Sequence, residues 1–246
     1  MFCKVGFSMK TVDQMPDYGS PPLPGPFNAA QIPILMDGTG SKIQDALTML
    51  QNSPPKYLEL YNEPDFSVWN TPMTDPTTAA NQLVPVIKAA PPSTTLIAPA
   101  LAFPNPGPGA PYGDFYGIFS DILNNGQCPG CWDKIGILSM HIYTEHAQEV
   151  MDRVTTLRSR FPNKQIWITE LSPATGTCTM DTPGVIQWMD AVFAGLANLP
   201  MVTKVFWNCG EAGGSGNGMA SGSCNPSLTN PDGSTTPLLK EYAKMC

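Results

Sequence analysis

At 246 residues, the chain is long enough for one large α/β domain with a substantial hydrophobic core, and its 42% apolar content excludes an intrinsically disordered protein. Only 13% of the residues are charged and the formal net charge is −7, which argues against a surface for nucleic acid or for an anionic membrane. The 27 prolines indicate a loop-rich protein whose surface is polar rather than charged, which suits an extracellular setting.

Stretches with strand character alternate along the chain with stretches of helical periodicity. Strands are predicted at Lys4–Ser8, Gln31–Met36, Lys56–Asp65, Thr94–Pro99, Ile135–Tyr143, Gln165–Glu170 and Lys204–Asn208. Helices are predicted at Ser41–Asn52, Asp75–Ala90, Gly113–Asn124, His146–Arg160, Thr182–Leu199 and Leu238–Lys244. Ser41 and Asp75 are predicted to cap their helices, with Pro76 at the first helical position.

This alternation predicts a parallel sheet covered by helices, and more specifically a (β/α)8 TIM barrel formed by a single domain over residues 1–246. No glycine-rich turn follows any predicted strand, which disfavours a dinucleotide-binding fold. Seven strands are found where the barrel needs eight, because the stretch between Ser8 and Ile32 is too short for two ordinary strand–helix units. We expect one unit to be reduced to a stub around Pro24–Ala30, or the N-terminus to be trimmed.

Two of the predicted strands deliver a glutamate at their C-terminal end. The first presents Asn62 and Glu63 at its tip, where Pro64 stops it, and the second ends in Glu170. A single acid that opens a loop is usually no more than a solvated side chain. Because the C-terminal ends of barrel strands point to one rim, however, Glu63 and Glu170 are expected to face the same cleft. Two such carboxyl groups are what the hydrolysis of a glycosidic bond requires.

The seven cysteines leave at least one thiol without a partner in the chain. The sequence from Cys128 to Cys131 is compatible with a redox motif, a zinc site or a disulfide that closes a short loop. The disulfide is the preferred interpretation, because the pair lies in a loop and no second cysteine pair at matching spacing completes a zinc site. A second disulfide is predicted between Cys209 and Cys224, which flank a glycine-rich loop. With two histidines in the chain, no metal site is expected, and no cofactor is predicted.

Three motifs, taken together and in their order along the chain, resemble glycoside hydrolase family 128. They are YNEPDF at Tyr61–Phe66, HIY at His141–Tyr143 and IWITE at Ile166–Glu170. The Cys-x-x-Cys sequence before the second motif resembles the fungal members of that family. The resemblance extends over roughly residues 32 to 208.

The resemblance implies a retaining β-1,3-glucanase, with Glu63 as the general acid/base and Glu170 as the nucleophile. In this mechanism the two carboxyl groups lie about 5–5.5 Å apart. The negative charge of Glu170 is expected to raise the pKa of Glu63, so that Glu63 holds the proton that the leaving oxygen needs. The implied partner is β-1,3-glucan or its oligosaccharides, and the motifs do not distinguish internal cleavage from cleavage at a chain end.

Five further residues are predicted to contact the sugar or to support the two acids. Asn62 is expected to bind a sugar hydroxyl, the alternative being a loop-capping asparagine. His141 and Tyr143 lie on one face of their strand, which lets Tyr143 hydrogen-bond the second glutamate. His141 is expected either to support the cleft floor or to be a satisfied core residue. Trp207 and Asn208 end the last strand, where a sugar-stacking platform is predicted.

Other aromatic and acidic residues receive structural predictions. Trp167 is predicted to lie in the core, whereas Trp69 and Trp132 are candidates for outer sugar contacts in loops. Glu59 lies four residues before Glu63, so it is expected on the same face of the strand and is predicted to point into the barrel interior. A carboxylate there needs a cationic partner or a proton, and Lys4 is the candidate partner.

Two other functions are compatible with the sequence. The first is a non-catalytic protein that binds β-1,3-glucan or oligosaccharides on a degenerate barrel, which the missing unit favours and the presence of both glutamates opposes. The second is a glycosidase that cleaves a β-1,4 linkage, which the resemblance opposes. The protein is expected to be a monomer that is secreted or held in a cell wall, although no signal peptide is recognisable at the start of the chain.

Overall fold

The computed structural model describes residues 5–7, 32–35, 37–66, 73–107, 110–126, 128–173, 178–208, 224–228, 230 and 234–244. The chain divides into two compact units. The N-terminal unit comprises Lys10–His141 with Asn163–Gln165, and the C-terminal unit comprises Met1–Met9, Ile142–Pro162 and Ile166–Cys246. Both units are built from parallel strands and from helices, so the predicted α/β class is confirmed.

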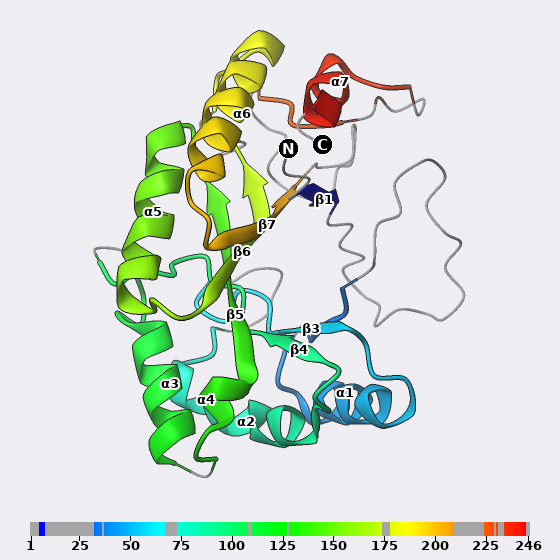
Figure 1. Cartoon of the computed structure of the whole chain (residues 1–246), viewed down its shortest axis with the longest axis vertical. Helices are drawn as coiled ribbons and strands as arrows, with labels where there is room; N and C mark the ends of the chain where they lie inside the picture. Colours follow the sequence, from blue (N-terminus) through cyan, green and yellow to red (C-terminus); the bar gives the residue numbers. More distant parts are fainter. Residues whose placement is uncertain are drawn as a thin grey trace. The chain divides into compact units, whose positions relative to one another are not determined.

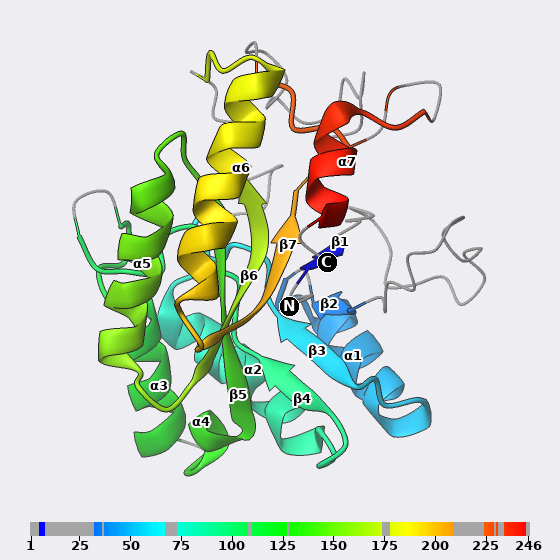
Figure 2. The same ribbon diagram turned by 45° about the horizontal axis from the view of Figure 1, so that its top comes forward.

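In the N-terminal unit, the strands follow the order β5-β4-β3-β2 and every pair is parallel. Their bounds are Ile34–Leu35 for β2, Tyr57–Leu60 for β3, Thr95–Ile97 for β4 and Ile135–Tyr143 for β5, which ends two residues into the other unit. The helices are α1 (Gly40–Asn52), α2 (Pro76–Ala89), α3 (Phe115–Asn125) and α4 (Cys131–Lys134). α2 contacts both α1 and α3 (Figure 1). Figure 2 shows β3 and β4 side by side, and Leu58 pairs with Leu96 between them.

In the C-terminal unit, the strands follow the order β1-β7-β6, again with parallel pairs. The bounds of the strands are Val5–Phe7 for β1, Gln165–Ser172 for β6 and Val202–Trp207 for β7. The helices are α5 (Ala147–Arg160), α6 (Thr182–Ala197) and α7 (Pro237–Lys244). α6 packs on α5 and on α7. The buried residues of α5 are Val150, Val154 and Leu157, which recur at helical spacing on one face.

Local chemistry explains where α2 begins, but not where α1 and α4 begin. Asp75 precedes α2, and its side chain accepts hydrogen bonds from the backbone N–H groups of Thr77 and Thr78, each at 3.0 Å, as the N-cap prediction required. The Ser41 prediction is wrong: α1 begins one residue earlier at Gly40, and Thr39 occupies its N-cap position without a side-chain cap. The short helix α4 was not predicted, because a single turn carries no periodicity that a sequence pattern can reveal.

The first four strands, β1 to β4, are shorter than predicted, whereas β5 has the predicted bounds and β6 and β7 are longer than predicted. β3 ends at Leu60, so Asn62 and Asp65 lie in the loop that follows it, and β2 spans two residues. Among the described residues, no strand pairing closes a sheet into a barrel. The loop around Pro24–Ala30 lies outside the described residues. No helix in the described part of the chain is long and apolar enough to cross a membrane.

Two disulfides are present among the described residues. Cys128 and Cys131 are bonded, as predicted. The predicted bridge between Cys209 and Cys224 is wrong, because Cys224 is bonded to Cys178. The prediction paired cysteines that lie close together along the chain. The observed bond instead joins residues 46 positions apart, which the fold brings together with their Cα atoms 5.5 Å from one another.

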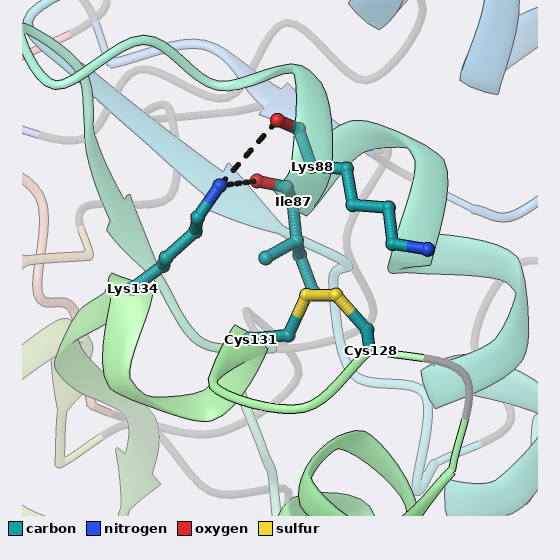
Figure 3. Close-up of a disulfide and its surroundings, with 5 residues drawn as sticks. All are labelled: Ile87, Lys88, Cys128, Cys131 and Lys134. Carbon is teal, nitrogen blue, oxygen red and sulfur yellow. Dashed lines mark hydrogen bonds between the residues drawn. A yellow bond between two sulfur atoms is a disulfide. The ribbon is translucent and has the colours of Figure 1, made fainter.

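The Cys128–Cys131 disulfide holds the first turn of α4, and Lys134 holds its end (Figure 3). The Lys134 ammonium donates to the carbonyl oxygens of Ile87 and Lys88, each at 3.4 Å, at the C-terminal end of α2. A cation at this position complements the partial negative charge of the helix terminus. Because α4 leads directly into β5, these contacts fix where that strand begins.

Removing the two disulfides is expected to have unequal effects on stability. The Cys178–Cys224 bond spans 46 positions and the Cys128–Cys131 bond spans three. In the loop-entropy description the longer loop contributes about 4 kcal/mol and the shorter about 2 kcal/mol. Paired serine substitutions, Cys178→Ser with Cys224→Ser and Cys128→Ser with Cys131→Ser, should therefore rank in this order in chemical denaturation. Equal losses, or a larger loss for the short loop, would contradict the ranking.

Candidate active site

The loop after β3 holds Glu63 in an unusual backbone conformation. Tyr61 and Glu63 have φ angles of 67° and 45°, a region that residues other than glycine rarely occupy. The Glu63 N–H donates to the carbonyl of Ala100 at 2.8 Å, and the Ala100 N–H donates to the carbonyl of Tyr61 at 3.0 Å. These paired bonds to the segment after β4 hold both strained residues, which fits a side chain that must be aimed in one direction.

The carboxylate of Glu63 contacts His141. Its Oε1 atom lies 2.7 Å from Nδ1 of the imidazole, and the side chains are 11% and 1% exposed. When Glu63 is ionised, the ring nitrogen donates the shared hydrogen; when Glu63 is protonated, its hydroxyl can donate to the nitrogen. The pair can therefore support either protonation state of the carboxyl group. His141, predicted to support a cleft floor or to be a satisfied core residue, is buried and hydrogen-bonded to Glu63.

Asp65 lies two residues after Glu63 and was not predicted as a functional residue. Its carboxylate is buried and accepts hydrogen bonds from the N–H groups of Ala102 at 3.0 Å and Phe103 at 2.6 Å. Burial raises the pKa of Asp65 to about 6, the two backbone donors oppose the rise, and the nearby charge of Glu63 adds to it. Asp65 thus joins the loop after β3 to the loop after β4.

In the C-terminal unit, Glu170 lies near the end of β6 and is buried. Its Oε2 atom accepts a hydrogen bond from the hydroxyl of Tyr143, and Asn208 Nδ2 donates to the same oxygen at 3.3 Å. The Asn208 amide also donates to the Tyr143 hydroxyl. Two neutral donors on one carboxylate oxygen stabilise negative charge there, and the prediction that Tyr143 hydrogen-bonds Glu170 is confirmed.

Asn208 is held in place by its backbone, whose N–H donates to the carbonyl of Leu171 at 3.0 Å. The sequence placed Asn208 at the end of β7 but could not show that its amide turns toward Glu170. The sequence did hold a signal for this contact. Asn208 and Glu170 come at the ends of two predicted strands, and an amide can donate a hydrogen bond to a carboxylate on a neighbouring strand. Contacts of Asn208 with a sugar remain a prediction.

The loop after β5 is also anchored by polar contacts. The Thr144 hydroxyl donates to Glu149 at 2.5 Å, and the Thr144 N–H donates to the carbonyl of Ser172 at 3.3 Å. Glu149 also accepts from the guanidinium of Arg153 at 2.9 and 2.6 Å. These bonds tie the start of α5 to the residue that follows Tyr143.

The sugar-stacking prediction for Trp207 is wrong. Its side chain is 0% exposed, its indole N–H donates to the carbonyl of Pro226 at 2.8 Å, and its ring packs against Trp188 and Tyr242. An indole enclosed on this scale has no free face for a sugar. The helices α6 and α7 supply the two enclosing rings, which no local pattern around Trp207 reveals.

The other aromatic and acidic predictions have mixed outcomes. Trp167 lies in the core as predicted, whereas Trp132 belongs to α4 and is buried, so its predicted outer sugar contact is wrong. Glu59 is buried and accepts a hydrogen bond from the Ser139 hydroxyl at 2.5 Å. Asn62 forms a parallel bridge with Ala100. Lys4 and Trp69 lie outside the described residues.

Comparison with known proteins gives one family match, and residues 13–242 match the family described as glycosyl hydrolase catalytic core. No curated protein matches the chain.

Several solved structures of glycoside hydrolase family 128 are similar to this chain. A subgroup VI exo-β-1,3-glucanase from Aureobasidium namibiae has 16% identity and a TM-score of 0.65, with 87% of this chain and 77% of that chain covered. A subgroup I endo-β-1,3-glucanase variant from Amycolatopsis mediterranei, in complex with laminaripentaose, has 15% identity and a TM-score of 0.64, with 91% and 87% covered. A subgroup VII oligosaccharide-binding protein from Cryptococcus neoformans has 18% identity and a TM-score of 0.59, with 88% and 80% covered. At these identities the similarity shows a shared fold.

The raised pKa of Asp65 predicts a specific pH dependence of stability. Between about pH 4 and 6 the folded chain keeps a proton on Asp65 that the unfolded chain has released, so this residue lowers stability as the pH rises through that window. Asp65→Asn removes the titration, and the stability difference between wild type and variant should change by roughly 2.5 kcal/mol between pH 4 and pH 7.

The measurement is urea denaturation of both proteins across this pH range. Asp121→Asn, at an exposed aspartate on α3, serves as the control and should leave the pH dependence unchanged. A wild type and Asp65→Asn variant that differ by the same amount at every pH would contradict the assignment.

Proposed function

This chain belongs to the glycosyl hydrolase catalytic core family, and from that premise we propose that it cleaves β-1,3-glucan by a retaining double displacement. Glu63 acts as the general acid/base and Glu170 as the nucleophile. Support for the substrate comes from solved structures of similar fold. They include β-1,3-glucanases, one of them in complex with laminaripentaose. Whether a chain is cut internally or from its end follows from the shape of the cleft, and the proposal covers both modes.

One observation carries the proposal: β5 offers a hydrogen bond to each glutamate. His141 bonds Glu63, and Tyr143, two residues further along the strand, bonds Glu170. Side chains at this spacing lie on one face of a strand, roughly 6–7 Å apart. A retaining mechanism needs two carboxyl groups about 5–5.5 Å apart, and we propose Glu63 and Glu170 as this pair because each is hydrogen-bonded by a side chain of the same strand.

In the first step, Glu63 gives its proton to the glycosidic oxygen while Glu170 attacks the anomeric carbon. The bond to the leaving sugar breaks, and an ester forms between the glucan and Glu170. In the second step, Glu63 removes a proton from water, which attacks the same carbon and releases Glu170. Two inversions at one carbon retain its configuration.

The neighbouring residues support these steps in distinct ways. His141 accepts or donates the hydrogen that it shares with Glu63, so it can follow the change from acid to base. Tyr143 and Asn208 orient Glu170 and stabilise its charge before attack and on release. Asn62, which precedes the acid/base, is proposed to bind the sugar hydroxyl beside the reacting carbon.

The fold, the domain organisation, the oligomeric state and the location are proposed together with the β-1,3-glucanase function. We propose that the strands belong to a (β/α)8 barrel with one reduced unit, that the two units form one catalytic domain, and that the protein is a secreted or cell-wall monomer. The family match supports the single domain because it spans residues of both units. The two disulfides are consistent with an oxidising extracellular setting.

A non-catalytic oligosaccharide-binding function is the second candidate, because a protein of this description from Cryptococcus neoformans shares the fold. The two candidates differ in the fate of a linear β-1,3-glucan. The proposed enzyme releases reducing ends and first forms a product with retained anomeric configuration, which NMR can follow with time. A wild-type protein that binds laminaripentaose and releases no reducing ends would overturn the proposal in favour of the binding protein.

Substitution of the two glutamates tests their roles. Glu63→Gln removes a general acid/base and should lower kcat by about 10²–10⁴-fold, and Glu170→Gln should lower it at least as much. Glu241→Gln, on α7, is the matched control and should retain wild-type activity. Reducing-sugar release measures the rate, and retained binding of laminaripentaose shows that the variants are folded. Undiminished activity in either glutamate variant would remove that residue from the mechanism.

Tyr143→Phe tests the support of the nucleophile. Loss of one hydrogen bond to a charged carboxylate typically costs about 1.5–3 kcal/mol, so kcat should fall by roughly 10- to 100-fold with little change in KM. Tyr57→Phe is the control, because Tyr57 lies at the opposite end of β3 from Glu63. An equal effect of the two substitutions would show that Tyr143 has no specific role.

A further inference from the structure

Phe66 is a large apolar side chain left open to solvent close to Glu63. It is 43% exposed, and its backbone N–H donates to the carbonyl of Glu63 at 3.0 Å. Its ring meets that of Phe103, with the centroids 5.9 Å apart and the planes inclined by 62°. In the described part of the chain only two other large apolar side chains, Met73 and Ile118, are comparably exposed. Phe66 is therefore the exposed ring nearest in sequence to the proposed acid/base.

The buried carboxylate of Asp65 holds these two rings together. Asp65 precedes Phe66 in the chain, and one of its oxygens accepts the backbone N–H of Phe103 at 2.6 Å. The other oxygen accepts the N–H of Ala102 at 3.0 Å. Burying this carboxylate is unfavourable, as its raised pKa of about 6 shows. This unfavourable burial is compatible with a functional role for the arrangement of Phe66 and Phe103, which the hydrogen bonds of Asp65 hold in place.

We propose that Phe66 and Phe103 form a saccharide platform near Glu63, which holds a glucose unit of the glucan outside the two units joined by the bond that Glu63 protonates. The proposal rests on the proposed function and adds a binding surface to it. The ring hydrogens of a β-linked glucose form an apolar face, which stacks on a flat aromatic ring without a polar partner. Trp207 is enclosed in the core and offers no ring face to a sugar, whereas the ring of Phe66 is 43% exposed.

Binding to a catalytically silenced protein tests the platform separately from the chemistry. In the Glu170→Gln background, Phe66→Ala and Phe103→Ala are titrated by calorimetry with laminari-oligosaccharides of two to six units. The platform predicts that the affinity for the longest oligosaccharide falls by roughly 5- to 20-fold in each variant. Only chains that reach from the cleft to the platform can lose the contact, so the disaccharide should change by less than about twofold.

Matched variants separate stacking from general damage. Ile118→Ala removes a side chain of similar exposure, 39%, from α3 and should leave all affinities unchanged. Phe66→Leu keeps an apolar side chain without a flat ring and should bind as weakly as Phe66→Ala, whereas Phe66→Tyr should bind as the parent does. Because the two rings form one surface, the double variant should lose less than the product of the single losses.

Several results would overturn the platform. Affinities that do not change in Phe66→Ala and Phe103→Ala, or that fall equally for all chain lengths, would contradict it. A change confined to self-association, measured by sedimentation, would make the rings a contact between copies of the chain instead. If the wild type still cleaves the polymer in these cases, the proposed function stands and only the platform fails. If the wild type neither binds nor cleaves β-1,3-glucan, the proposed function fails and the platform falls with it.

Discussion

Side-chain alternation along β5 is the constraint on which both glutamate clusters depend. His141 and Tyr143 are separated by one residue, so they share a face of the strand, and each hydrogen-bonds a different glutamate. A one-residue shift in the register of β5 would turn both side chains to the opposite face and leave Glu63 and Glu170 without these partners. The contacts of Lys134 and the Cys128–Cys131 disulfide around α4, at the start of β5, therefore support residues at its far end.

The clusters also show where the chain accepts unfavourable local structure. Tyr61 and Glu63 adopt positive φ angles, and Asp65 is buried as an acid with a raised pKa. Each of these features costs free energy, and each is held by hydrogen bonds to the segment that follows β4. The described start of the loop after β3, residues 61–66, is thus held in one conformation, which suits the proposed role of Glu63 as an acid that meets its substrate in one orientation.

Aromatic residues divide between stability and recognition according to what encloses them. Trp207 stands at the end of a strand, where a sugar contact is expected, yet α6 and α7 surround it and its ring contributes to the core. Phe66 and Phe103, on loops, keep exposed surface beside Glu63. Burial of Trp207 is favoured by the large apolar area that its indole removes from water, whereas Phe66 keeps an exposed ring surface for the proposed sugar contact.

Sequence patterns alone determined the alternation of strands and helices, the bounds of β5, and the delivery of Glu63 and Glu170 at or beside strand ends. These features depend on neighbouring residues, because periodicity, capping and strand parity are properties of short segments. Tertiary structure decided that Cys224 bonds Cys178, that Trp207 is enclosed, and that Asp65 accepts two backbone hydrogen bonds from another loop. Each of these outcomes depends on which distant segments meet, and neither the local pattern of apolar residues nor their spacing specifies that pairing.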